Sequence, residues 1–130
     1  MNNKIIFNSE LSIEEVKGRG RYNKSFVVCI NGKDNPTIDD FFKTVKVAYQ
    51  FSDADLWDQV IDWFTDLDWI QQTSYVLIIE NWTAFLEKDK IEKDNFIDIF
   101  KHNILPWWER DVVNHVVGGE PRNFNVYLFD

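Results

Sequence analysis

Two runs of five apolar residues, 26–30 (FVVCI) and 75–79 (YVLII), most limit what this chain can fold into. Neither run alternates between apolar and polar residues, so each is expected to form a short strand covered on both faces. A third run, residues 124–129, alternates and predicts a final strand. Helical patterns separate the runs, and strands that alternate with helices favour a parallel sheet with helical crossovers. The sequence therefore predicts an α/β fold with a small three-stranded parallel sheet packed with helices.

Helical periodicity is clear on both sides of the second run. After Pro36, Thr37 and Asp40 form a capping-box pattern, and the apolar residues that follow recur at a spacing of three or four. Residues 87–93 are expected to form a polar loop remote from the acidic stretch described below. A later helix is expected over residues 96–104, and Pro106 is expected to interrupt it.

The first 24 residues differ from the rest of the chain. They are less apolar and contain a basic cluster spaced by two glycines, namely Lys17, Arg19, Arg21 and Lys24. This stretch is expected to be an extension or a surface hairpin with solvated cations, and RNA binding by these cations is the alternative. The 130 residues have the length of one ordinary domain. We interpret residues 1–130 as a single domain, with an N-terminal extension at 1–24 and the core at 25–130.

Charge and cysteine content narrow the possible partners. The formal net charge of −8 argues against nucleic acid or an anionic membrane as partner and favours a cationic one. The single cysteine, Cys29, excludes an internal disulfide and fits a reducing compartment. No signal-peptide pattern and no apolar segment of about 20 residues is found. A cytoplasmic protein is expected.

Residues 51–69 (FSDADLWDQVIDWFTDLDW) hold six aspartates and no Lys or Arg. A helix capped by Ser52 would gather four of them in a sector of roughly 80°, namely Asp55, Asp58, Asp62 and Asp66. Like charges four residues apart destabilise a helix by a few tenths of a kcal/mol, so solvation alone does not account for the stripe. We interpret it as a face for a cationic partner, with a solvated face, a metal site and catalytic carboxylates as alternatives.

Five short motifs, in their order along the chain, resemble the barstar family. They are FVVCINGK, TIDDFF, LWDQVIDWFTDLDW, YVLIIENWTAFL and FIDIF, and the resemblance covers about residues 25–130. It implies a barstar-like fold and an intracellular inhibitor without catalysis. In this family an acidic second helix, with the segment before it, blocks a ribonuclease active site by placing carboxylates where RNA phosphates bind.

The resemblance also implies which residues contact the partner. Asp58 and Asp62 correspond to the family's helix-two acids, Trp57 to the apolar residue before the first acid, and Ile61 to a position that is aromatic in the best-known member. Thr65 and Asp66 correspond to the end of the contact helix, His102 corresponds to an acid on the late helix, and Asp55 is the acid before the first of the pair. The expected partner-binding residues are therefore Asp55, Trp57, Asp58, Ile61, Asp62, Thr65, Asp66 and His102. Ala54 and Leu56 stand where the family has Gly and Asn, and His102 where the best-known member has an acid. These departures imply a different partner or a different binding mode.

The function expected from the sequence is inhibition of a basic secreted ribonuclease or of a toxin's nuclease domain, as a bacterial immunity protein or antitoxin. No enzyme activity, cofactor or metal is expected, because His102, His115 and Cys29 form no metal-ligand spacing. One alternative is an acidic interaction module with a non-nuclease partner. The other is a small hydrolase that uses Asp58 with Asp62, or Asp62 with Glu80, as acid and base.

Overall fold

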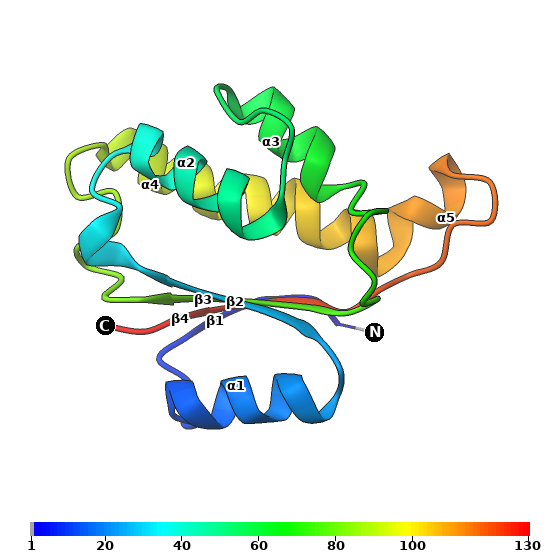
Figure 1. Ribbon diagram of the computed structural model, residues 1–130, viewed down its shortest axis with the longest axis horizontal. Helices are drawn as coiled ribbons and strands as arrows, with labels where there is room; N and C mark the ends of the chain where they lie inside the picture. The colour runs from blue at the N-terminus through cyan, green and yellow to red at the C-terminus, as the bar shows by residue number, and fades with distance from the viewer. Residues whose placement is uncertain (1) are drawn as a thin grey trace.

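The computed structural model describes residues 2–130, and at its centre is a parallel β-sheet with helices on both faces (Figure 1). The strands are β1 (Ile5–Phe7), β2 (Phe26–Asn31), β3 (Tyr75–Glu80) and β4 (Phe124–Leu128). The α-helices are α1 (Ile13–Tyr22), α2 (Ile38–Tyr49), α3 (Trp57–Phe64), α4 (Lys90–Ile99) and α5 (Val112–His115). A 3₁₀ turn, η1 (Gly32–Asp34), follows β2, and two π-helical segments, η2 (Phe100–Ile104) and η3 (Trp107–Asp111), follow α4. The α/β class and the parallel sheet predicted from the sequence are confirmed.

The sheet has the strand order β1-β4-β3-β2, and each neighbouring pair is parallel. The expected three-stranded sheet is corrected to four strands, because the N-terminal stretch contributes β1, with Ile5 opposite Val126 at the sheet edge. The same stretch forms α1 rather than a surface hairpin, and Ser12 and Glu15 close a capping box at its start. A strand of three residues is too short to show periodicity, so the sequence pattern could not reveal it.

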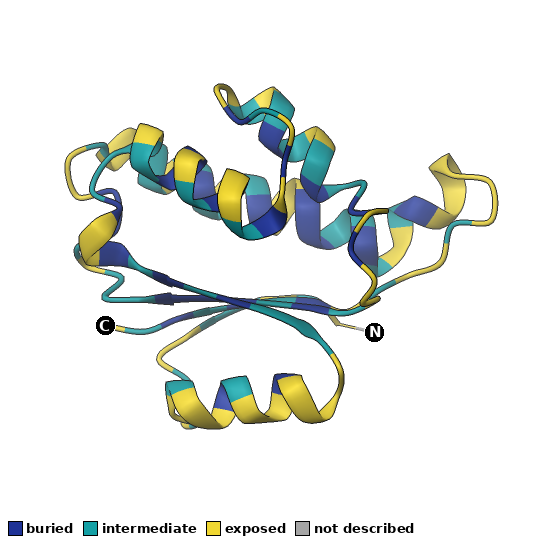
Figure 2. Ribbon diagram, in the orientation of Figure 1, coloured by how far each residue is buried: buried dark blue, intermediate teal, exposed yellow. Residues whose placement is uncertain are grey.

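The hydrophobic core lies between the sheet and the larger helical layer of α2, α3 and α4 (Figure 2). Phe41, Leu77, Phe96 and Phe124 are all fully buried there. The capping box predicted at the start of α2 is confirmed: Thr37 Oγ1 accepts the Asp40 N–H, and the Asp40 carboxylate accepts the Thr37 N–H. Local sequence signals therefore fix where α2 begins and which face it buries.

The late helix is not interrupted at Pro106, so that expectation is wrong. The chain stays helical over residues 90–115, through α4, η2, η3 and α5. In η2 the turn is wider, because the Leu105 N–H bonds the Phe100 carbonyl five residues back. This wide turn lies directly before Pro106 and gives the proline ring room that an α-helical turn lacks. Among residues 2–130, no helix has the length and apolar content needed to cross a membrane.

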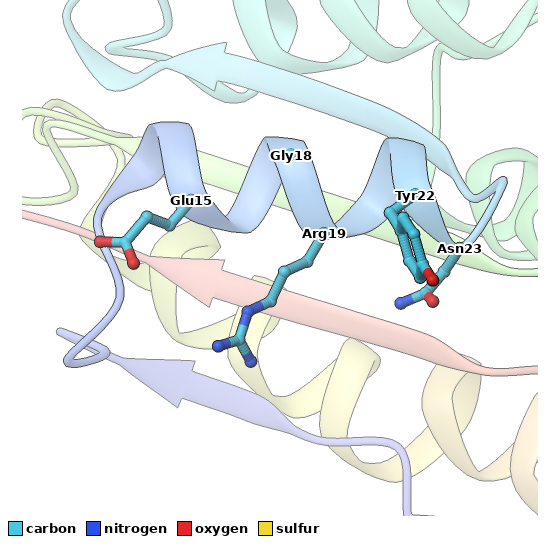
Figure 3. A pocket seen from close by; sticks show the side chains of 5 residues that line it. All are labelled: Glu15, Gly18, Arg19, Tyr22 and Asn23. Atoms are coloured by element: carbon cyan, nitrogen blue, oxygen red, sulfur yellow. The ribbon is translucent and has the colours of Figure 1, made fainter.

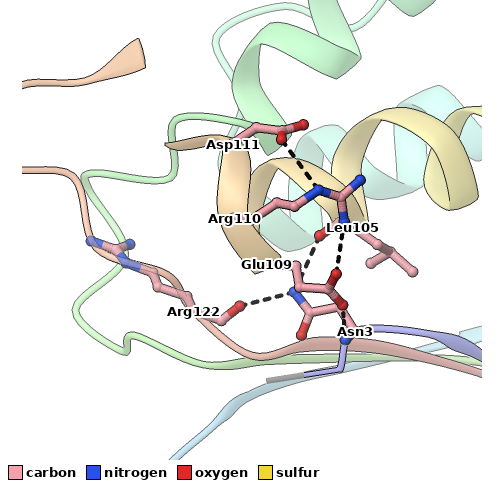
Figure 4. Close-up of polar contacts among 6 residues, drawn as sticks. All are labelled: Asn3, Leu105, Glu109, Arg110, Asp111 and Arg122. Carbon is pink, nitrogen blue, oxygen red and sulfur yellow. Dashed lines mark hydrogen bonds and ion pairs between the residues drawn. The ribbon is translucent and has the colours of Figure 1, made fainter. Parts of the chain in front are cut away.

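Asn3 ties the beginning of the described chain to the late helix and to β4 (Figure 4). Its backbone N–H donates to Glu109 Oε1 (2.8 Å), and its side-chain amide donates to the carbonyls of Leu105 (3.2 Å) and Arg122 (3.0 Å). Its Oδ1 accepts the N–H of Phe124 (3.0 Å). These bonds hold the segment before β1 at the edge of the sheet.

The two glycines of α1 lie in different surroundings, since Gly20 is buried and Gly18 is exposed. Gly20 is buried against β2, where an added Cβ would lie 2.5 Å from Val27 Cγ2. An added Cβ at Gly18 would meet no atom within 4 Å. Only Gly20 is therefore required for α1 to approach the sheet.

We expect Gly20→Ala to lower the free energy of unfolding by about 1–3 kcal/mol, because the new methyl group overpacks the helix–sheet contact. Gly18→Ala should raise it by about 0.5–1 kcal/mol, since alanine loses less backbone freedom in a helix. Urea denaturation of both variants measures the contrast. Equal effects of the two substitutions would contradict the packing of α1 on β2.

Candidate functional site

α3 lies on the outer side of the helical layer, away from the sheet (Figure 1). Its inward residues Val60 and Phe64 are fully buried. The Phe64 ring centroid lies 4.7 Å from that of Tyr49 and 5.3 Å from that of Phe100, both in edge-to-face geometry. These contacts hold α3 in one orientation, so its outward side chains have a defined place on the surface.

α3 begins later than the sequence predicts. The expected cap at Ser52 is wrong, because the first helical residue is Trp57. Phe51 is buried, and this burial keeps the preceding segment non-helical against the core. Gln59 Oε1 takes the place of a capping side chain by accepting the N–H groups of Asp55 (2.8 Å) and Leu56 (3.3 Å).

The outward side of α3 carries Asp58 and Asp62, one helical turn apart and both exposed. No Lys or Arg in residues 2–130 forms an ion pair with either carboxylate. The helix ends at Phe64, so Asp55 and Asp66 lie in the flanking segments and not on the helix. The expected stripe of four acids on one helix is therefore corrected to a pair on α3 with one acid on each side. We call Asp55, Asp58, Asp62 and Asp66 the acidic face.

The other predicted contact residues lie around this face. Ile61 is half-buried on α3, and Thr65 directly follows the helix, where its hydroxyl donates to the Ile61 carbonyl (2.8 Å). His102 is exposed on η2, the segment whose Phe100 supports α3. Over the described chain, no hydrogen bond or ion pair links His102 to α3. The structure thus places Ile61 and Thr65 with the acids and leaves His102 on a neighbouring helix.

Trp57 packs towards the core. Its ring meets Phe42 edge-on at 5.1 Å, and its Nε1 donates to Glu92 Oε2 (2.9 Å). Glu92 lies on α4, which begins at Lys90, so the expectation of a remote polar loop at 87–93 is wrong over residues 90–93. Leu56, directly before Trp57, is 62% exposed beside the acids. Sequence reasoning missed Leu56, although two adjacent apolar residues at a helix start rarely both face the core.

At one end of the acidic face, Asp66 lines a cavity and has a raised pKa. Partial burial raises the pKa of Asp66, and a hydrogen bond with Asp68 raises the pKa further. Both aspartates line a cavity of about 620 Å³ together with Trp108 and Arg122. The Arg122 guanidinium lies over the Trp108 ring (4.8 Å) and donates to the Tyr75 hydroxyl. The two carboxyl groups therefore lie close together at this end of the acidic face, beside the cavity.

The arrangement suits binding better than acid–base chemistry. Asp58 and Asp62 project from an exposed helix, whereas a carboxylate pair that cleaves a bond must flank the substrate. Glu80 ends β3 in the sheet, opposite Asn31 of β2 and in a different layer from Asp62. Within the described part of the chain, no three His, Cys, Asp or Glu side chains converge in a way that could hold a metal ion.

Comparison with known proteins adds three findings. A sequence model of the family described as "Barstar (barnase inhibitor)" matches residues 25–119, which hold β2 to α5 and the whole acidic face. A search of curated protein sequences finds no match. Among solved structures, the fold is similar to a chain in "Structure of Drosophila ORC bound to AT-rich DNA and Cdc6", with a TM-score of 0.53 and 12% identity. That likeness covers 98% of this chain and 40% of the other, and at this identity it concerns the fold alone.

Proposed function

Because this chain belongs to the barstar family, we propose that it inhibits a basic ribonuclease, or the nuclease domain of a toxin, by covering the enzyme's active site with the acidic face. It would act in the cytoplasm of the cell that makes the nuclease, as an immunity protein or antitoxin, without catalysis of its own. The observation that carries the proposal is the pair Asp58 and Asp62, which are exposed and form no ion pair among residues 2–130, on a helix held in place by buried aromatic rings.

The proposed mechanism is phosphate mimicry. A ribonuclease holds its substrate through cationic side chains that bind RNA phosphates, and carboxylates can accept the same charge-assisted hydrogen bonds. Because α3 is already ordered, little conformational entropy is lost when the carboxylates bind. The net charge of −8 attracts a basic enzyme over a long range and speeds association.

The residues of the surface take different roles in this proposal. Asp58 and Asp62 supply the central charge contacts, and Asp55 and Asp66 extend the contact at either end. Ile61, Thr65 and His102 form the rim. An interface also needs a desolvated apolar contact, which we assign to exposed Leu56. Trp57 positions α3 through Phe42 and Glu92.

Leu56→Ala is expected to weaken binding to the nuclease by about 1–2 kcal/mol with little change in stability, because the side chain is 62% exposed. Trp57→Ala should instead lower the free energy of unfolding by about 2–3 kcal/mol, since a half-buried ring and its packing are lost. Val47→Ala on α2, 80% exposed, is the control: it should leave binding unchanged and alter the free energy of unfolding by no more than about 0.5 kcal/mol. Calorimetric titration and urea denaturation separate the two effects. An unchanged dissociation constant for Leu56→Ala would remove Leu56 from the interface.

The direct test is an RNA-cleavage assay. Purified protein is titrated into basic ribonucleases, namely barnase and any basic nuclease found to be encoded beside this chain's gene. The proposal expects stoichiometric loss of cleavage for at least one of them. If neither enzyme is inhibited while the folded protein binds a basic partner that is not a nuclease, the chain is an acidic interaction module instead.

A further inference from the structure

The face of the sheet opposite α3 is only partly covered. α1 packs on β2 and β3, and in Figure 3 the strands β4 and β1 extend beyond it. On the uncovered half, Ile6 of β1 lies opposite Tyr127 of β4. Parallel sheets are normally covered on both faces, so an open half of such a sheet is a place where a ligand can bind.

A cavity of about 570 Å³ lies between α1 and this open half. Arg19 and Asn23 line it from the helix side, and Asn123, Asn125 and Tyr127 line it from β4 and the residue before β4. Figure 3 shows the Arg19 side chain leaving α1 on the side of β4. The volume falls within the range of small-molecule sites, about 300–1,000 Å³.

This cavity is lined by one cationic side chain and by several neutral side chains that can form hydrogen bonds. Of the described residues 2–130, Arg19 is the one ionised residue that lines it, in a chain whose net charge is −8. Within residues 2–130, no carboxylate lies at ion-pair distance from Arg19, and no hydrogen bond engages the side chains of Arg19, Asn23, Asn123 or the Tyr127 hydroxyl. Asn125 accepts the Lys4 N–H through Oδ1 (3.0 Å) and keeps its amide donors free. The cavity therefore offers one cation and several neutral donors and acceptors.

Two neighbouring aromatic rings lie at the end of β4, and one of them, Tyr127, also lines the cavity. Tyr127 and Phe129 lie on the same side of the strand, with ring centroids 6.4 Å apart and planes 9° apart. Both rings are half-buried, and on this face α1 packs mainly on β2 and β3. Aromatic faces on an open sheet are the surfaces on which nucleic-acid bases stack.

We infer that this cavity binds a nucleoside phosphate. The base stacks on Tyr127, the phosphate pairs with Arg19, and the amides of Asn23, Asn123 and Asn125 bond the sugar and the base edge. A longer RNA strand does not fit as well, because each further phosphate needs its own cation and the cavity supplies one. The site lies on the face opposite α3 and does not depend on the proposed inhibition of a nuclease.

The test is a titration of the ¹⁵N-labelled protein with AMP, adenosine and inorganic phosphate, followed by NMR. AMP should shift the amide resonances of Ser25, Ser74 and Asn125, which all line the cavity, and it should bind more tightly than either adenosine or phosphate. Arg19→Gln should weaken AMP binding at least about tenfold, because a charge-assisted bond is lost. Arg21→Gln, in the same turn of α1 but outside the cavity, should leave the affinity unchanged.

Four results would overturn the inference. They are the absence of shifts at millimolar AMP, equal affinities for AMP and inorganic phosphate, and equal losses in Arg19→Gln and Arg21→Gln. The fourth is that a single-stranded oligonucleotide binds more tightly than AMP, with an affinity that falls steeply as the salt concentration rises. That result would indicate an RNA-binding surface instead.

Discussion

Reversal of both central charges, in the variant Asp58→Lys/Asp62→Lys, is expected to abolish inhibition of the nuclease and leave the fold intact. Both side chains are exposed, and two lysines one turn apart repel each other about as the two aspartates do, so the fold loses no favourable contact. In the complex, two attractive contacts become repulsive at the centre of the interface, which costs several kcal/mol, or on the order of a thousandfold in affinity. The RNA-cleavage assay measures the loss.

The chain offers a matched control for this variant. Asp94 and Asp98 are also exposed, also four residues apart, and lie on α4, so Asp94→Lys/Asp98→Lys changes the net charge equally. The control should keep nearly full inhibition. Raised salt should slow association of the wild type much more than it speeds dissociation. If the Asp58/Asp62 variant still protects RNA as well as the wild type does, the acidic face is only a solvated surface.

Phe64→Ala should give the largest loss of stability, about 3–5 kcal/mol in the free energy of unfolding. Phe64 is fully buried, and its ring meets four others edge-on, those of Tyr49, Phe51, Phe100 and Phe124. The truncation removes these contacts and leaves a cavity beneath α3. A domain of this size has a total stability of about 5–15 kcal/mol, so the variant should unfold at a markedly lower temperature and urea concentration.

Ile91→Ala is the control for Phe64→Ala, because Ile91 is an apolar residue of α4 that is 78% exposed. It should change the free energy of unfolding by no more than about 0.5 kcal/mol. Urea denaturation followed by circular dichroism compares the two variants. A loss below about 1 kcal/mol for Phe64→Ala would contradict the packing of α3 on the aromatic core, since large-to-small changes in a core cost more.

Part of the candidate site follows directly from the sequence. The spacing of Asp58 and Asp62 places them one turn apart on a helix, and the structure confirms that both are exposed on its outer side. The orientations of Leu56 and Trp57 do not follow from the sequence. Both are apolar and adjacent, and the choice of which faces inward depends on Phe42, which lies on a different helix. That these residues bind a nuclease stays a prediction.

The sequence by itself determined the elements whose signals are local. Strands β2 and β3 follow from uninterrupted apolar runs, and the start of α2 follows from Thr37 and Asp40, because these patterns depend on residues only a few positions apart. The tertiary structure decided the rest. β1 exists because Ile5 pairs with a strand that begins 119 residues later, α3 starts late because Phe51 is buried, and the helix passes Pro106 because a π-helical turn precedes it. For β1 and the start of α3, contacts distant in sequence outweigh a local preference worth about 1–3 kcal/mol, whereas at Pro106 a change in the local hydrogen-bond pattern does so.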